Sequence, residues 1–371
     1  MRTFLLILAA TALCSCSRQP ADPAPAASAA DAKQLNLYIW ADYLAPDTLK
    51  NFEARTGIQV KVSFFDTNET LETKVLTGNS GFDVVVPTAP YLERQIAAGA
   101  YQPLDKSKLP NLRNLDPALM RMVARHDPDN RHAVIYIRGT EGIGFNEEAV
   151  KKLLPNHPLD SWSLIFDPAN ASKLASCGIQ IMDNPGGVIR LVLAYLHRDP
   201  NAPTPEDLQA AEQTLLKIRP YVRTIDSFNS TEALANADVC ALVGYNGDVS
   251  LAKARLRDRK SPLKLGYIIP AEGSIMWFDM LAIPKDAPHV AAAHAFIDYV
   301  LEPAVMAEVS NHMAYANANT ASTPLVNPAV LSDPVIYPSE AETQRLFVQL
   351  ADTPDKARAL TRIWQRFKTG Q

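Results

Sequence analysis

The sequence predicts an α/β fold, and three observations lead to this prediction. Short strand-like runs alternate with helical segments along most of the chain. The loops between these segments are short, as in parallel α/β domains. From Leu35 onward the chain has 337 residues, which is more than one hydrophobic core usually organises. We therefore expect two α/β units.

The first α/β series begins at Leu35. Residues 35–40 form a β-type run, because they are rich in the aliphatic and aromatic residues that favour strands. The next segment, 46–55, opens with Pro46 and Asp47, and both proline and acidic residues are favoured in the first turn of a helix. The series continues with expected strands at 58–64 and 82–86 and expected helices at 69–76 and 91–98.

A second α/β series begins near Gly144 and extends to the end of the chain. Its expected strands are 178–182, 239–245, 265–269 and 277–283. Its expected helices are 160–166, 187–195, 205–218, 290–301, 340–350 and 354–367.

Residues 1–16 have the pattern of a secretory signal. A positive start precedes an apolar run at 4–13, which is shorter than the roughly 20 residues of a membrane-spanning helix. The sequence Leu-Cys-Ser-Cys at 13–16 resembles a bacterial lipobox, so we expect lipidation of Cys16. Cys14 fits this motif less well, because a bulky leucine precedes it. The alternative is an ordinary signal that is cleaved without lipidation.

Residues 17–34 are rich in alanine and proline and lack large apolar side chains. Such a segment cannot bury enough apolar surface to pack, so we expect a tether. If it is extended at about 3.1 Å per residue, it reaches roughly 55 Å.

Charge and cysteine content narrow the class of protein. The chain has 36 basic and 40 acidic residues, a net charge of −4, which argues against nucleic acid as a partner. Cys177 and Cys240 are the cysteines outside the signal, and two cysteines in an oxidising compartment usually pair. Loop entropy predicts roughly 4 kcal/mol of stabilisation from such a pair. Two buried free thiols are the alternative.

Sequence motifs of common enzymes are absent. The chain has no phosphate-binding G-x-x-x-x-G-K-[ST], no G-x-S-x-G and no H-E-x-x-H. Its seven histidines are scattered, and no nucleophile stands beside a base. We therefore expect no catalytic residues, no metal and no cofactor.

Aromatic and acidic residues adjoin each other at three strand-like segments, namely Trp40-Ala41-Asp42-Tyr43, Tyr245-Asn246-Gly247-Asp248 and Trp277-Phe278-Asp279. A single cluster of this kind is explained by a core aromatic beside a turn aspartate. Three clusters instead suit a ligand with ammonium groups on a methylene chain. Each buried ammonium needs a carboxylate, and aromatic faces attract both the cation and the methylenes.

The chain resembles the bacterial periplasmic putrescine- and spermidine-binding proteins from about Leu35 to its C-terminus. The densest matching stretches are 42–48, 81–87, 102–110, 126–130 and 315–319. The resemblance implies a two-lobed, type II periplasmic-binding fold with two chain crossings and a ligand cleft between the lobes. Lobe 1 would comprise 35–140 and 262–318, and lobe 2 would comprise 141–261 and 319–371. We expect hinge strands near 136–143 and 266–269.

The resemblance also implies a set of site residues. The acids Asp248 and Asp279 would grip one ammonium, and Cys177 would pair with Cys240. The aromatic box and the polar positions at the other end of the ligand would be Trp40, Tyr245, Trp277, Tyr315, Asp42, Tyr43, Thr88 and Ser227.

This sequence departs from the putrescine-binding pattern at four positions. Ala41 replaces a serine and Gly186 replaces a glutamate, so the distal ammonium site lacks a hydroxyl and a carboxylate. Tyr245 replaces a tryptophan and Trp277 replaces a phenylalanine. These changes leave open which polyamine is bound.

The resemblance implies a monomeric polyamine-binding protein in the periplasm that delivers its ligand to the permease of an ABC importer, with the lipid on Cys16 holding it to a membrane. A polyamine sensor of the same fold is one alternative. An enzyme that acts on amines is another, but it would need a base or nucleophile beside the ligand.

Overall fold

The computed structural model describes residues 33–371. The predicted signal at 1–16, its Cys16 and most of the predicted tether at 17–34 lie outside the described residues. Gln34 already belongs to the first strand, so regular structure begins one residue earlier than expected.

Within the described residues, the strands form one mixed sheet of 11 strands. Its main path follows the order β2-β1-β3-β9-β4-β7-β5-β6. On this path β2, β1 and β3 are parallel to one another at one side, and β7, β5 and β6 are parallel to one another at the other side. The central β9 and β4 are antiparallel to their neighbours. The strands are β1 (Gln34–Trp40), β2 (Gln59–Phe65), β3 (Val84–Val85), β4 (Ala133–Asn146), β5 (Ile179–Ile181), β6 (Val222–Ile225), β7 (Ala241–Tyr245), β8 (Leu265–Ile268), β9 (Ser274–Ala282), β10 (Ala316–Asn317) and β11 (Leu346–Phe347).

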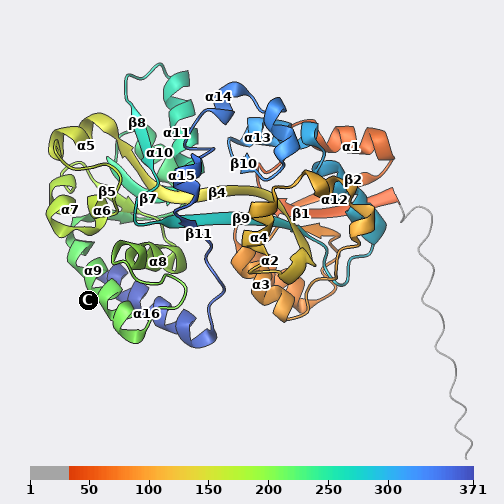
Figure 1. The fold of residues 1–371 in the computed structure, drawn as a ribbon, viewed down its shortest axis with the longest axis horizontal. Helices are drawn as coiled ribbons and strands as arrows, with labels where there is room; N and C mark the ends of the chain where they lie inside the picture. The colour runs from red at the N-terminus through yellow and green to blue at the C-terminus, as the bar shows by residue number, and fades with distance from the viewer. Residues whose placement is uncertain (1–32) are drawn as a thin grey trace, which may run out of the picture.

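Helices lie on both sides of the sheet (Figure 1). They are α1 (Thr48–Thr56), α2 (Asn68–Thr77), α3 (Ala89–Ala97), α4 (Pro117–Val123), α5 (Glu147–Leu153), α6 (Ser163–Phe166), α7 (Pro168–Leu174), α8 (Pro185–Tyr195), α9 (Pro205–Ile218), α10 (Ser230–Ala235), α11 (Asn246–Asp258), α12 (Val290–Val300), α13 (Pro303–Met313), α14 (Pro328–Leu331), α15 (Glu340–Thr343) and α16 (Pro354–Thr369). Within the described part, no single helix has the length and apolarity to cross a membrane, although α12 and α13 together meet both criteria across a 73° bend.

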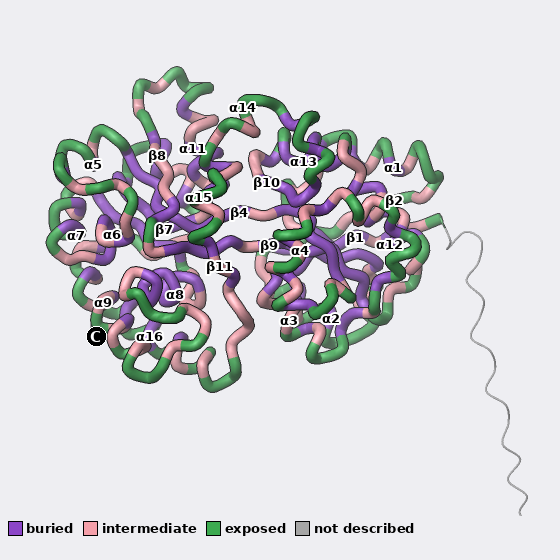
Figure 2. The backbone as a smooth tube through the Cα atoms, in the orientation of Figure 1, coloured by how far each residue is buried: buried purple, intermediate pink, exposed green. Residues whose placement is uncertain are grey.

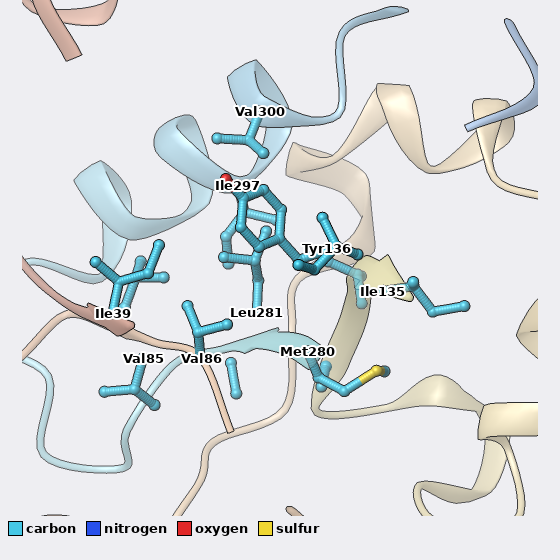
Figure 3. Packing of buried hydrophobic residues seen from close by; sticks show 14 of the residues in the cluster. Ile39, Val85, Val86, Ile135, Tyr136, Met280, Leu281, Ile297 and Val300 are labelled. Atoms are coloured by element: carbon cyan, nitrogen blue, oxygen red, sulfur yellow. The ribbon is translucent and has the colours of Figure 1, made fainter. Parts of the chain in front are cut away.

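The buried apolar residues separate into two main clusters along the sheet. The first cluster contains buried residues of β1, β3, β4, β9 and α12. In Figure 3, Tyr136 and Leu281 lie on the side of the sheet that faces Ile297 of α12, whereas Val85 points away from that helix. The second cluster joins the far end of β4 to β5, β7, α8, α9 and α16. Figure 2 shows these two buried regions at opposite ends of the molecule, with β4 and β9 running between them.

Strands β4 and β9 connect the two clusters. Residues 133–140 of β4 pair with 276–282 of β9 on the side of the first cluster. Residues 141–145 of β4 then pair with β7 on the side of the second cluster. The predicted hinge strand at 136–143 therefore does cross.

The second predicted hinge strand, 266–269, contributes only Ile269 to the buried residues of the first cluster and is not the strand that carries the chain across. It forms β8, which pairs with the far end of β4 at residues 143–146, and Leu265 packs with Leu234 and Val249. The chain turns after β8, where Pro270 and the left-handed Gly273 (φ 107°) end the strand. The second crossing is β9, which begins at Ser274. The assignment of 35–140 with 262–318, and of 141–261 with 319–371, to two lobes stays a prediction.

Local sequence explains where most elements begin and end. Helix α9 matches its predicted bounds, because Thr204 and Asp207 form a capping box around Pro205. The predicted helix at 340–350 is wrong beyond Thr343, because Leu346 and Phe347 instead pair in parallel with the start of β9. The predicted disulfide is confirmed, since Cys177 and Cys240 are bonded with their Cα atoms 5.4 Å apart.

Candidate ligand-binding site

A cavity of about 540 Å³ lies between the two clusters and is lined by residues from both. This volume is within the usual range for small-molecule sites, roughly 300–1,000 Å³. Eight of the ten predicted site residues line it, namely Trp40, Tyr43, Thr88, Ser227, Tyr245, Trp277, Asp279 and Tyr315. Trp40 and Tyr245 stand at the carboxyl ends of β1 and β7, where ligands bind in open α/β sheets.

The crossing strands form the floor of the cavity. Asp279 pairs with Ile137, Trp277 pairs with Gly139, and Glu141 pairs with Tyr245. Paired residues, and alternate residues along one strand, point to the same face of a sheet. Asp279, Trp277 and Glu141 therefore follow one another along this floor.

Gly139 makes room for the indole of Trp277. A Cβ atom at position 139 would collide with Cζ2 and Cε2 of Trp277 and lie 2.5 Å from Oδ1 of Asn246. Only a residue without a side chain leaves this space free. The indole therefore lies over the backbone of β4, midway along the floor.

Aromatic rings form the walls of the cavity. The Trp40 indole nitrogen donates to the Val86 carbonyl at 2.9 Å, which fixes the orientation of the ring. The ring of Tyr315 lies 5.1 Å from Trp277 and 6.5 Å from Tyr43, and Tyr245 lies 6.4 Å from Trp277. These rings offer a continuous apolar and π-electron surface to a ligand.

Asp279 is a buried carboxylate on this floor, with 3 % of its surface exposed. It accepts hydrogen bonds from the hydroxyls of Thr88 at 2.6 Å and Tyr43 at 2.9 Å. Burial outweighs these bonds and raises the pKa of Asp279 to about 6. No cationic side chain within residues 33–371 contributes to that pKa, so the negative charge has no counter-ion there.

Thr88 donates its hydroxyl hydrogen to Asp279 and does not use its side chain to cap a helix. It is the N-cap residue of α3 but makes no side-chain cap bond to the helix. Instead, Asn68 holds it from both sides, with Nδ2 donating to Oγ1 and Oδ1 accepting from the Thr88 amide, each at 3.0 Å.

Asp248 lies beside the cavity without lining it. It is in the first turn of α11, and burial raises its pKa to about 6 despite a 3.3 Å hydrogen bond from Thr231. Its charge also raises the pKa of Tyr245 and Tyr315, which do line the cavity. The charge of Asp248 is therefore near enough to act on both rings.

Asp42 lies outside the cavity. It is exposed in a turn after β1 and has a left-handed backbone, with a φ of 61°. This turn directs the chain away from the end of the strand, and Tyr43 rather than Asp42 reaches the site.

Comparison with known proteins identifies the family of this chain. Residues 47–337 match the family model described as bacterial extracellular solute-binding protein. The chain belongs to the bacterial extracellular solute-binding proteins.

Relatives of this solute-binding protein are similar over nearly their whole length. It is 46% identical to the putrescine-binding periplasmic protein PotF of Escherichia coli, over 92% of this chain and 93% of that protein. It is also 46% identical to the putrescine-binding periplasmic protein SpuD of Pseudomonas aeruginosa, over 93% and 94%. These relatives confirm the predicted resemblance.

Solved structures agree with this assignment. The spermidine/putrescine substrate-binding protein PotD of Streptococcus pneumoniae superposes with a TM-score of 0.80 and 25% identity, over 91% of this chain and 99% of that one. The likeness confirms the predicted two-lobed, type II periplasmic-binding fold with two crossings.

The cavity of this solute-binding protein also contains residues that sequence reasoning missed. Glu141 on β4, Asn184 at the start of α8, and Phe228 line it. Phe228 is 86% exposed, and Glu141 is almost fully buried. A glutamate within an otherwise nearly buried strand was the available signal for Glu141, but only the pairing of β4 with β7 reveals that it faces the site.

Proposed function

We propose that this protein captures a polyamine in its cavity and delivers it to the permease of an ABC importer in the periplasm. The observation that carries the proposal is a buried, hydrogen-bonded Asp279 that has no cationic partner among the described residues and faces a wall of aromatic rings. A buried carboxylate of this kind is unfavourable unless a ligand brings a positive charge.

The names of relatives agree with this ligand class. Proteins with 46% to 31% identity are named for putrescine, agmatine, cadaverine and spermidine. The rings of Trp40, Trp277, Tyr245 and Tyr315 would hold the methylenes, and Asp279 would hold one ammonium. The resemblance implies that Asp248, beside the cavity, adds its charge to the same ammonium. We assign Asp42 no contact with the ligand. Ser227 and Thr88 would hold other groups in place, since the Ser227 hydroxyl accepts from the Asp183 amide at 2.9 Å.

We propose a binding role without catalysis, because the acids that line the cavity suit ion pairing with an amine and the relatives are named as binding proteins. The proposed location is the periplasm, in agreement with the names of the relatives. Attachment through a lipid on Cys16, and a monomeric state, remain part of the proposal.

Calorimetric titration tests the proposed function. Protein freed of carried-over ligand should bind putrescine, cadaverine, agmatine or spermidine with 1:1 stoichiometry. The uncharged 1,4-butanediol, which matches putrescine in chain length, should not bind. Absence of binding by all four amines would refute the proposal, as would equal binding of the diol.

A further inference from the structure

Glu141 is a buried acid in the cavity that the site described above does not use. It lies on β4, is 2% exposed, and lines the cavity. Its Oε2 has no hydrogen-bond partner within residues 33–371, and its Oε1 has only the amide of Asn184 at 3.5 Å. A buried carboxyl with so little compensation is costly, so its place in the cavity requires an explanation.

Space around Glu141 is kept open by a glycine. A Cβ atom at Gly187, in the first turn of α8, would lie 2.8 Å from Oε2 of Glu141. The backbone of Glu141 is fixed independently, since its carbonyl accepts from the hydroxyl of Ser274 on β9. The backbone that carries the carboxyl group is therefore held at a defined place on the floor of the cavity.

The cation whose charge acts on Glu141 is already engaged. Arg190 on α8 donates to Asp352 at 2.6 Å, to the Leu350 carbonyl at 3.0 Å and to the Gly186 carbonyl at 2.9 Å. The other groups that face Glu141 are neutral or acidic, namely Asn184, the hydroxyls of Tyr245 and Tyr267, and Asp248 beyond them. Burial raises the pKa of Glu141 to about 8, although Arg190 opposes this shift.

The position of Glu141 relative to Asp279 follows from the strand register. Asp279 is opposite Ile137, and Glu141 is four residues further along β4. At the usual rise of a strand, the backbone positions of the two acids are therefore separated by roughly 13 Å along the strand axis. The indole of Trp277 lies between them, over Gly139. Two carboxyl groups thus stand at the two ends of an aromatic platform.

We infer that Glu141 is the counter-charge for the second ammonium group of the ligand, so that the cleft selects amines with two terminal positive charges. This inference rests on the proposed function and specifies the far end of the same site. One ammonium pairs with Asp279, the methylenes lie on Trp277, and the other ammonium pairs with Glu141.

The span between the two acids suits a short diamine. The nitrogens of a four-carbon diamine are joined by five single bonds of about 1.5 Å each. Because the extended chain is a zigzag, the nitrogens lie only roughly 6 Å apart. A charge-assisted hydrogen bond of about 2.8 Å at each end extends this to roughly 12 Å. A monoamine of the same length leaves one of the two carboxyl groups without a partner.

Comparison of a diamine with a monoamine in the Glu141→Gln variant tests the inference. The wild type should bind putrescine at least a hundredfold more tightly than n-butylamine. Glu141→Gln should weaken putrescine at least tenfold and change n-butylamine less than threefold, so the preference for the diamine falls. Glu141→Asp keeps the charge and should retain most of this preference. The exposed Glu148 at the start of α5 provides a matched control, and Glu148→Gln should change neither affinity.

Proton release provides a second readout that a structural role would not change. At pH 7 the wild type should release close to one proton when putrescine binds, because the ammonium favours the ionised form of Glu141. Titrations in phosphate and Tris, which differ in ionisation enthalpy, measure this release. Glu141→Gln should release almost none.

The outcomes distinguish a failure of the proposed function from a failure of the assignment of Glu141. If wild type binds no amine, the proposed function fails. If wild type binds putrescine but Glu141→Gln, with an unchanged melting temperature, keeps both the affinity and the proton release, only the assignment of Glu141 fails. Equal weakening of putrescine and n-butylamine also overturns it.

Discussion

Tyr43 donates its hydroxyl hydrogen to Oδ2 of Asp279 at 2.9 Å, although the two residues are 236 positions apart in the chain. Thr88 donates to the other oxygen of the same carboxyl group. These two bonds orient the carboxyl group but bring no positive charge to it. The acid is thus fixed in position and still needs a cation.

The first prediction concerns the acids of the proposed site. Asp279→Asn and Asp248→Asn should each weaken putrescine binding by roughly two to three orders of magnitude, because removing one partner of a buried charge pair costs about 3–5 kcal/mol. Trp277→Ala should cost less, because cation–π terms are smaller. Calorimetry measures these affinities, and Asp47→Asn at an exposed position serves as the control. Unchanged binding in both aspartate variants would show that the two acids are structural.

The second prediction concerns the pH dependence of the ligand-free protein. Burial raises the pKa of Asp279 from its ordinary 3.8 to about 6, so between these values the folded state holds a proton that the unfolded chain has released. Its contribution to stability is therefore full below pH 4 and is lost as the pH rises through 6. Asp279→Asn should make this decline shallower in thermal melts from pH 4 to 7.5. Parallel curves for wild type and variant would contradict it.

The third prediction concerns Gly139. Gly139→Ala should lower the free energy of unfolding by about 1–3 kcal/mol and weaken ligand binding, because the added methyl group displaces Trp277. Trp277→Ala removes the indole and leaves Asn246 as the remaining obstacle, so the double variant should be more stable than the sum of the two single changes implies. Denaturant titration of the four proteins measures this coupling, and strict additivity would show that the two residues do not clash.

The fourth prediction concerns the disulfide. Replacing Cys177 and Cys240 by serine should lower the free energy of unfolding by about 2–4 kcal/mol, because the bond closes a loop with a sequence separation of 63. Neither cysteine lines the cavity, so the affinity for putrescine should stay within about twofold of wild type. A large loss of affinity in a folded variant would indicate that the bond positions the site.

The fifth prediction concerns Cys16, which lies outside the described residues. Mass spectrometry of the membrane-bound protein should show acyl groups on Cys16, and Cys16→Ala should appear in the soluble fraction or keep its signal. A wild-type protein with a free, unmodified N-terminus would exclude the lipid anchor.

Local signals in the sequence predicted elements well where the chain itself determines their ends. The capping box around Pro205 set the start of α9, and the predicted bounds of that helix match. The segment after Thr343 was predicted as helix, but its pairing with β9 depends on a strand about 70 residues earlier. The hinge at 266–269 was wrong for a similar reason, since β-rich composition does not reveal which strand crosses.

The candidate site shows the same limit. Aromatic residues next to acids pointed to Trp40, Tyr245 and Asp279, and these residues meet in one cavity. The sequence gives no sign that Asp42 turns outward, because that depends on its backbone conformation. Glu141 went unnoticed because its partner strand β7 lies about 100 residues away in sequence.

The two crossing strands have a consequence for how the protein would distinguish amines of different length. Asp279 and Glu141 stand on β9 and β4, which are hydrogen-bonded to each other along 133–140, and neither acid belongs to a loop. A bend of these strands changes the angle between the two halves far more than it changes distances along the strand axis. We therefore expect the spacing of the two acids to stay nearly constant if the angle between the two halves changes, so that the strands themselves select the length of the amine.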